Sequence, residues 1–277
     1  GASNVAVGMN ALDANTTASY NTAVGTDALT ANTTGTQNTI VGKSAGAANT
    51  TGGYNVAMGT DTFSSNTEGA NNTAIGWQTM AGNTTGGENV AVGKGALDGG
   101  TTCEGNVAIG TDAMGGAVAG QGYNTAVGYN AMLVSTSATG TTAIGNQSLD
   151  ALTTGDNNTA VGAGSLGANT TGAENTALGT GALDANTTGN YNTGLGRNAL
   201  GGNTTASYNT SVGWNSMLAS TTGDDNSALG YKALNANTTA AGNTAIGFQA
   251  LLVNTTGASN VAVGRKQYCC RTSNIRR

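Results

Sequence analysis

The sequence predicts an all-β protein, a parallel β-solenoid (β-roll) of sixteen 17-residue coils stacked on one another. The motif Asn-Thr-Ala-Val-Gly, seen at residues 21–25, recurs sixteen times with small variations. Every step is 17 residues long, except one of 18 residues between Asn106 and Asn124. A fixed period of this length, with one glycine position and one aliphatic position kept in every repeat, is typical of chains in which each repeat forms one coil.

Numbering each repeat from its asparagine, as position 1, defines the content of a coil. Position 4 is aliphatic or methionine in every repeat, and position 2 is Thr, Val or Ser. Because alternate residues share one side of a strand, we expect positions 2 and 4 to face the interior. Position 9, mostly Leu or Met with Gly46 as a gap, is expected to form the opposite wall. Position 5 is always glycine, which indicates a positive φ or a close backbone approach.

The remaining positions predict turns and a hydrogen-bonded ladder. One turn follows the glycine, and Asn-Thr-Thr-Gly at positions 12–15 forms a second, which gives each coil two short strands. The position-1 asparagines, replaced only by Thr141, are expected to stack as an amide ladder. The 18-residue step predicts a bulged loop within residues 115–123. The repeats end after Gly264, so we expect a solenoid domain over residues 1–264.

Composition narrows the classes of function. The chain has 46 glycines, no proline, no histidine and only 8% charged residues, so backbone hydrogen bonds and small-residue packing must carry the fold. Residues 1–264 hold 14 acidic and four basic side chains, a net charge of −10, which argues against binding nucleic acid through its phosphates. Residues 265–277 hold five basic side chains and no acidic one. This segment is either a basic tail, able to contact an anionic partner or simply solvated, or the start of a truncated neck.

The small residues at position 3 predict a contact between chains. With positions 2 and 4 inside, position 3 points outward, yet it is Ala, Gly or Ser in fifteen repeats, with Ile40 as the exception. A column of alanine is what a close chain–chain seam needs, whereas the alternative is that neighbouring turns of the same chain cover it. The expected seam residues are Ala23, Ala74, Ala91, Ala108, Ala143 and Ala160.

Asparagine sequons recur at position 12. An Asn-Thr-Thr triplet accepts a glycan only where the cell has the machinery, and turn chemistry alone would also select these residues. If glycans are attached, this edge of the solenoid is coated with sugar. The candidate glycosylation sites are Asn15, Asn32, Asn49, Asn83, Asn169, Asn186, Asn203, Asn237 and Asn254.

Aromatic residues gather at two positions beside the turns. The last residue of the coil, just before the next position 1, is tyrosine in five coils, and position 6 is aromatic in five. Three of the latter occupy consecutive coils and should stack as a ladder. Exposed aromatic rings suit stacking against sugars, whereas the alternative is that they cover the turns and stabilise each other. The expected binding patch is Trp214, Tyr231, Phe248, Trp77 and Tyr129.

Other classes of site find little support. A threonine row at position 2 suggests ice binding on a flat solenoid, but the expected burial of this position argues against it. The acidic residues do not form a converging pair, so we expect no catalytic residues and no enzyme. Cys103 stands alone and Cys269 and Cys270 are adjacent, a pattern that is neither a disulfide framework nor a metal site. We therefore expect no cofactor and no metal.

The stacked Asn-Thr-Ala-Val-Gly motif over residues 1–264 resembles the head repeats of trimeric autotransporter adhesins and related repeats of phage tail fibres. This resemblance implies a left-handed parallel β-roll that forms a homotrimer side by side and binds host matrix proteins or surface glycans. The repeat here is longer than the usual head repeat. A coiled-coil stalk, a membrane anchor and a C-terminal fibre chaperone are also missing from this sequence.

Together these observations predict an extracellular, cell-surface or virion fibre segment that acts as an adhesin or receptor-binding rod. The alternative is a purely structural filament subunit, either bare or a glycoprotein, whose coils stack end to end. A polysaccharide-processing enzyme is a third possibility, but it would need two or three carboxylates in adjacent coils, and Asp224 and Asp225 share one turn. No apolar run reaches the ~20 residues of a membrane span.

Overall fold

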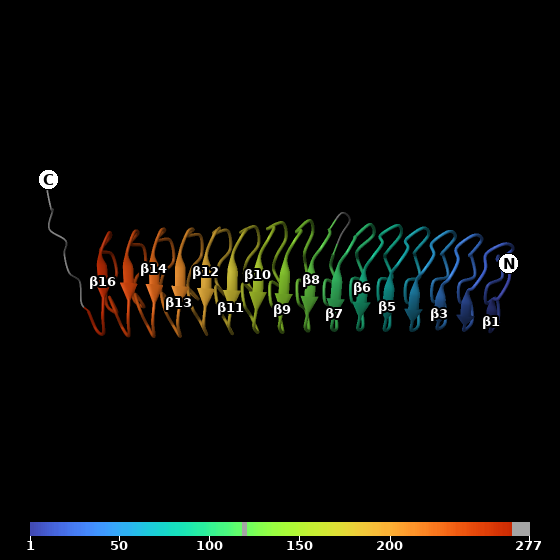
Figure 1. Ribbon diagram of the computed structural model, residues 1–277, viewed down its shortest axis with the longest axis horizontal. Helices are drawn as coiled ribbons and strands as arrows, with labels where there is room; N and C mark the ends of the chain where they lie inside the picture. The colour runs from blue at the N-terminus through green and yellow to red at the C-terminus, as the bar shows by residue number, and fades with distance from the viewer. Residues whose placement is uncertain (118–120, 268–277) are drawn as a thin grey trace. The chain divides into compact units, whose positions relative to one another are not determined.

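A computed structural model describes residues 1–117 and 121–267, and within them the chain is an all-β parallel solenoid with no helix (Figure 1). The fold class predicted from the 17-residue period is therefore confirmed. The expected bulge lies partly, and Cys269 and Cys270 lie wholly, outside the described residues. The sixteen strands are β1 (Val5–Val7), β2 (Thr22–Val24), β3 (Thr39–Val41), β4 (Val56–Met58), β5 (Thr73–Ile75), β6 (Val90–Val92), β7 (Val107–Ile109), β8 (Thr125–Val127), β9 (Thr142–Ile144), β10 (Thr159–Val161), β11 (Thr176–Leu178), β12 (Thr193–Leu195), β13 (Thr210–Val212), β14 (Ser227–Leu229), β15 (Thr244–Ile246) and β16 (Val261–Val263).

The chain divides into two compact units, and each is built in the same way. Unit 1 spans residues 1–141 and contains β1–β8, and unit 2 spans residues 142–277 and contains β9–β16. Within a unit, each strand pairs in parallel and in register with the next, as Ala74 of β5 does with Ala91 of β6. Every repeat position therefore stacks on its counterpart one coil away and forms a column.

Each coil contains one strand of three residues and not the two that were expected. The rest of the coil also bonds to its neighbour, for example through Leu29 N–H to the Ala45 carbonyl at 3.0 Å. It is not extended, because positions 7, 9 and 17 adopt left-handed backbone conformations, as in Asp27 (φ 57°), Leu29 (φ 53°) and Gln37 (φ 59°). A single left-handed residue ends the alternation that defines a strand, so these segments stack as turns.

The glycine at position 5 meets both physical expectations. In Gly93 the φ angle is +132°, and a Cβ atom added there would lie 2.5 Å from the Gly110 carbonyl oxygen of the next coil. No other residue type tolerates both the conformation and the contact, which explains why position 5 never varies in this chain.

The strand faces the interior with position 3, which reverses the predicted orientation. Ala91 is fully buried, whereas Val90 before it is 37% exposed and Val92 after it is half-buried. Position 9 does form the opposite wall, as predicted, and Leu97 is fully buried there. The interior of such a narrow coil holds one large side chain per layer. Because Leu97 supplies it, the strand must present a small residue to the core.

One coil shows this division of space directly, because its large and small residues are exchanged. Ile40 occupies position 3 and is 1% exposed, and Gly46 occupies position 9 of the same coil. A Cβ atom added to Gly46 would meet Ile40 Cγ2 at 3.4 Å and Leu29 Cδ1 at 3.5 Å. The isoleucine thus fills the volume that a leucine fills in the other coils.

Restoring the common arrangement in this coil should therefore need both changes at once. We expect Gly46→Leu alone to destabilise the protein by about 1–3 kcal/mol through overpacking. We expect Ile40→Ala alone to cost about 2–5 kcal/mol through a cavity. The double variant should cost less than the sum of the two, which a double-mutant cycle from urea denaturation would measure. Additive effects would show that the two side chains do not share one space.

Candidate functional site

Two asparagine ladders run through the core of each unit, one at position 1 and one at position 12. Asn192, at position 1, donates its backbone N–H (3.0 Å) and its Nδ2 (3.1 Å) to Asn175 Oδ1 of the preceding coil. Its Nδ2 also donates to the Ala206 carbonyl at 2.7 Å. Asn203, at position 12, donates Nδ2 to the same carbonyl at 3.0 Å and to Asn186 Oδ1 at 2.7 Å. The amide ladder predicted at position 1 is confirmed, and position 12 adds a second one.

The second ladder corrects the glycosylation prediction. A glycan would be attached through Nδ2, but at seven of the nine candidates the asparagine is buried and Nδ2 donates to the backbone carbonyl three residues later. The structure leaves no room for a sugar there, because each side chain satisfies a buried turn. These seven are Asn32, Asn49, Asn83, Asn169, Asn186, Asn203 and Asn237. Asn15 and Asn254, in the outermost coils, are half-buried, and their glycosylation stays a prediction.

The expected chain–chain seam is also wrong, because its alanines belong to the core of their own coil. Each is 0–1% exposed, so none can contact another chain without unfolding. The physical reason is the reversed strand orientation, which turns position 3 inward. The seam residues concerned are Ala23, Ala74, Ala91, Ala108, Ala143 and Ala160.

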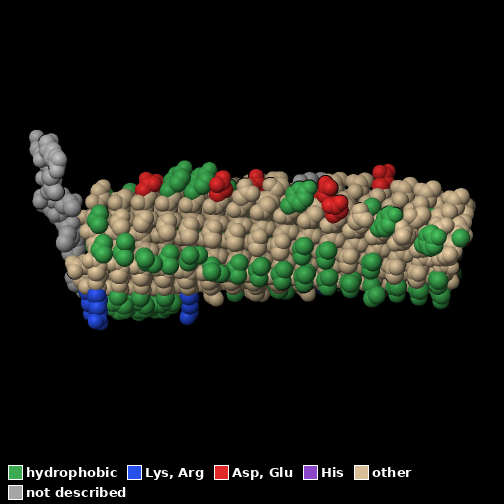
Figure 2. Space-filling view, in the orientation of Figure 1, with side chains coloured by type: hydrophobic (Ala, Val, Ile, Leu, Met, Phe, Trp, Pro, Cys, Tyr) green, Lys and Arg blue, Asp and Glu red, His purple; other side chains and the backbone are tan. Residues whose placement is uncertain are grey.

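Positions 2 and 4 form an exposed surface, which we call the strand face. Its position-4 column is made of large aliphatic side chains that water reaches, and hydrophobic side chains form bands across the strands in the space-filling view (Figure 2). In unit 2, Leu178 and Leu229 are each 50% exposed and Ile246 is 40% exposed. In unit 1, Met58 is 47% exposed. Contiguous exposed apolar surface of this kind marks an interaction site in soluble proteins.

The threonine row at position 2 also lies on the strand face. This row was predicted to be buried, and the structure shows that it is not. In unit 2 its members include Thr142, Thr159 and Thr176, which are half-buried or exposed. Burial therefore no longer argues against ice binding. The neighbouring position-4 column argues against it instead, because Ile, Val and Leu of unequal length alternate there and do not form a level surface.

The aromatic residues at position 6 of unit 2 form a stacked ladder with a cation at each end. Ring centroids lie 5.0 Å apart between Trp214 and Tyr231 and 4.9 Å apart between Tyr231 and Phe248. Arg197 and Arg265 occupy position 6 in the coils before and after these three. The Arg265 guanidinium lies 5.4 Å from the Phe248 ring centroid. We call these five residues, with Lys232 at position 7, the aromatic–cation ridge.

The ridge does not include the other two aromatic residues predicted for the binding patch. Trp77 and Tyr129 lie in unit 1, three coils apart, and are 48% and 52% exposed. Trp77 has its own cation, Lys94, whose Nζ lies 5.5 Å from the ring centroid. The structure therefore gathers three of the five predicted patch residues into one feature.

Stacking against sugars is not what the ladder geometry favours. The rings of Tyr231 and Phe248 are inclined by only 8°, so each covers a face of the other. Tyr231 has Trp214 on its other side, and Lys232 Nζ lies 5.3 Å and 5.5 Å from the Trp214 and Tyr231 ring centroids. Both faces of Tyr231 are thus covered by neighbouring rings, and Phe248 lies between Tyr231 and Arg265, so these two rings turn mainly their edges outward.

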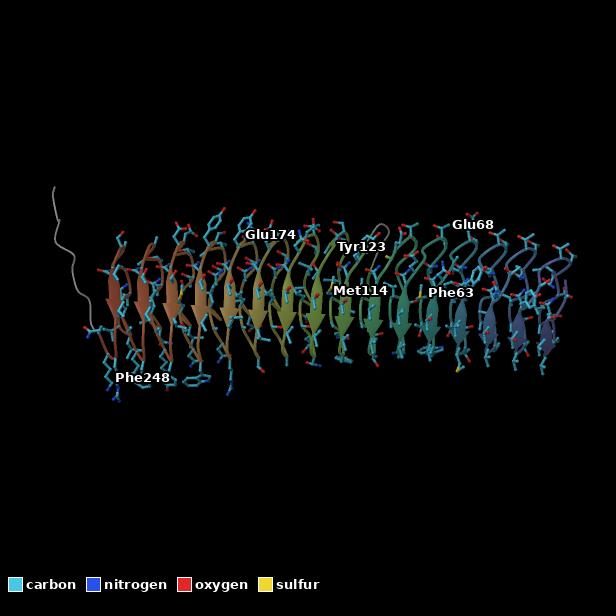
Figure 3. The ribbon with its side chains drawn as sticks, in the orientation of Figure 1. Phe63, Glu68, Met114, Tyr123, Glu174 and Phe248 are labelled. Carbon is cyan, nitrogen blue, oxygen red and sulfur yellow. The ribbon has the colours of Figure 1, made fainter. Side chains whose placement is uncertain are left out.

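Charge is segregated between the edges of the coil in unit 2. All four described basic residues occupy positions 6 and 7, whereas the acidic residues occupy positions 10, 16 and 17. Figure 3 shows Phe248 of the ridge at one edge of the unit and Glu174 at the opposite edge. No described carboxylate forms an ion pair with Arg197, Lys232 or Arg265, so their charge remains available.

Three acidic residues from consecutive coils of unit 1 line one depression, the arrangement that the third possibility, a polysaccharide-processing enzyme, would need. In unit 1, Glu68, Glu88 and Glu104 line an open depression of about 410 Å³. Across residues 1–117 and 121–267, no three His, Cys, Asp or Glu side chains converge as a metal site would require.

Asp98 and Asp150 are half-buried, and desolvation raises the pKa of both carboxyls. Their contribution to stability is therefore greatest at low pH and is lost as the pH rises through the raised pKa.

Comparison with known proteins does not assign the chain to a family. No family model matches the chain, and no curated protein matches it. No helix among the described residues is long and apolar enough to cross a membrane. The function must therefore be argued from the strand face and the aromatic–cation ridge.

Proposed function

We propose that the chain is a non-catalytic fibre segment whose copies associate side by side through the strand face. The observation that supports this is the exposed aliphatic column at position 4, which repeats in every coil. A solvent-facing strand position ordinarily carries polar or charged residues, yet none of the sixteen residues of this column is polar. The same face of the other copies, arranged around a common axis, would cover it.

The size of the face is consistent with stable association. Fully burying an aliphatic side chain contributes about 1.5–3 kcal/mol, so covering the exposed half contributes about 1 kcal/mol. Each unit presents eight position-4 side chains, which amounts to roughly 8 kcal/mol for each unit. The face of a single unit thus compares with an association cost of about 4–15 kcal/mol.

The stoichiometry that the repeat resemblance implies is three, and a homotrimer is therefore the assembly that we propose. The same resemblance supports an extracellular, cell-surface or virion location and a role as an adhesin or receptor-binding fibre. A structural filament subunit is the second candidate. It is favoured by the in-register stacking itself, because the pairing that joins one coil to the next within a unit is the pairing that end-to-end stacking of copies would use.

Charged substitutions on the strand face test the proposal. We expect Leu178→Glu, Leu229→Glu and Ile246→Glu together to dissociate the assembly into single chains, because three carboxylates per copy would be desolvated across the interface. Native mass spectrometry would then show a single species at 26.9 kDa. The far-ultraviolet circular dichroism spectrum should stay unchanged, because all three side chains point away from the core.

A matched control uses exposed hydrophobic residues away from this face. Tyr191 and Tyr208 lie at position 17 and are 47% and 59% exposed. Tyr191→Glu and Tyr208→Glu together should leave the native mass unchanged. If the strand-face variant keeps the mass of the unmodified assembly, association does not use this face. If it instead leaves open-ended multiples of the chain mass, the filament candidate is supported.

A further inference from the structure

We propose that the aromatic–cation ridge of unit 2 binds an acidic polysaccharide, a linear chain bearing sulfate or carboxylate groups. This inference rests on the adhesive role proposed above and assigns the ligand class to a site of its own. The ridge runs through five consecutive coils at position 6, from Arg197 through the three stacked rings to Arg265. In Figure 2 it appears as a hydrophobic cluster between basic side chains along one edge of unit 2.

The ridge is electropositive along its whole length, including its aromatic part. An aromatic ring carries negative charge on its faces and positive charge at its edge. Because Trp214, Tyr231 and Phe248 cover each other's faces, mainly the edges are turned to solvent. Arg265 lies over the Phe248 ring, and Lys232 Nζ lies at the side of the stacked pair of Trp214 and Tyr231, nearly equally far from the two ring centroids. The rings therefore separate the cations along the ridge, and the ring edges themselves do not repel an anion.

The spacing of the cations suits an extended chain of separated charges. Arg197 and Arg265 are four coils apart, which corresponds to roughly 19 Å at ~4.8 Å per coil. Lys232, two coils after Arg197, lies midway. A linear polymer with an anionic group every few sugar units would meet one cation after another. The acidic residues of unit 2 lie on other edges and would repel a polyanion that strayed from the ridge.

Nucleic acid fits this ridge less well. Single strands bind by stacking bases on free ring faces, but centroid distances of 4.9–5.0 Å leave no space for a base between these rings. An anionic membrane fits less well because a narrow row of cations at positions 6 and 7 offers little area to a flat surface. A linear polysaccharide fits better because it can extend along the row of cations.

Binding of dextran sulfate, compared with uncharged dextran, tests the inference on the full-length protein. We expect the unmodified protein to bind dextran sulfate and not dextran in isothermal titration calorimetry. Binding should weaken about tenfold or more between ~50 and ~200 mM NaCl, because each cation that contacts the polyanion releases counterions from it. Arg197→Gln with Arg265→Gln should lower the affinity about tenfold or more.

The matched control removes the same charge from the same repeat position elsewhere. Lys43 and Lys94 also occupy position 6, but they belong to unit 1 and are not part of the ridge. Lys43→Gln with Lys94→Gln should change the affinity less than about twofold. Equal losses in the two double variants would overturn the inference, as would equal binding of dextran. Tighter, ridge-dependent binding of single-stranded DNA or of phosphatidylglycerol vesicles would also overturn it in favour of another partner class.

The proposal for the ridge and the proposal for the strand face can be tested independently. The Arg197→Gln/Arg265→Gln variant should keep the native mass of the unmodified protein. The strand-face variant should still bind dextran sulfate, with the same affinity for each chain. Loss of binding with an intact assembly therefore concerns the ridge alone, and loss of assembly with intact binding concerns the proposed function alone.

Discussion

Glutamate at Ala74, Ala91 and Ala108 together is expected to unfold unit 1 and not to separate intact chains. These side chains are 0–1% exposed, and each stacks on the next in the inward-facing column. Three carboxylates without partners would lie about 4.8 Å apart in a space that holds only methyl groups. Burying one unpaired charge costs several kcal/mol, so the sum exceeds the stability of an ordinary domain of about 5–15 kcal/mol. Far-ultraviolet circular dichroism should show a reduced β signal, because the eight strands of unit 1 are lost.

The neighbouring residues provide the control for this experiment. Ile75, Val92 and Ile109 each follow one of the three alanines and point outward. Glutamate at these three positions adds the same charge to the same strands, yet the β signal should persist. If both triple variants fold, or if only the alanine variant does, the inward orientation of position 3 is wrong.

Removing one member of the position-1 ladder should have the second-largest effect. In Asn192→Ala, the backbone N–H of Asn209 loses its acceptor, Asn192 Oδ1, at 3.0 Å. Asn175 Oδ1 and the Ala206 carbonyl each lose Nδ2 of residue 192 as a donor, although the backbone N–H of residue 192 still donates to Asn175 Oδ1. The buried N–H left unpaired costs about 1–3 kcal/mol and each of the two other lost hydrogen bonds costs about 0.5–1.5 kcal/mol, so we expect a loss of about 2–6 kcal/mol in the free energy of unfolding. Chemical denaturation would measure it.

Asn235→Ala is the matched control for the ladder. Asn235 is half-buried and its Nδ2 donates a single 2.8 Å hydrogen bond to the Asn215 carbonyl. Its loss should cost about 1 kcal/mol, the usual net value of one hydrogen bond. Equal costs at Asn192 and Asn235 would mean that the ladder contributes no more than isolated surface hydrogen bonds do.

The period and the invariant glycine were sufficient to predict the solenoid, because stacking in register requires little more than a repeat of constant length. The orientation of the strand was not predictable from aliphatic character. Position 4 is the most hydrophobic column in the chain, yet it faces outward. The assumption that the most apolar column is inside fails where the interior is narrow and the opposite wall already fills it. The paired exchange of Ile40 and Gly46 is the one signal that places positions 3 and 9 in the same space.

The sites were predictable to different degrees. The stacking of Trp214, Tyr231 and Phe248 follows from their shared position in consecutive coils. The two arginines that flank them share that position too, so comparing position 6 across the coils would have found the ridge. The role of the asparagines at position 12 could not be decided in this way, because the sequence Asn-Thr-Thr serves equally as a glycan acceptor and as a turn. Only the direction of Nδ2, into the core, separates the two.

The mass of the unmodified protein under native conditions tests most directly whether the outward-facing strand face is an interface. A side-by-side homotrimer predicts one species at three times the chain mass of 26.9 kDa. The trimer should also persist on dilution, because its aliphatic face is costly to expose. A single species at 26.9 kDa would contradict the account, since it would leave an aliphatic column on every coil open to water.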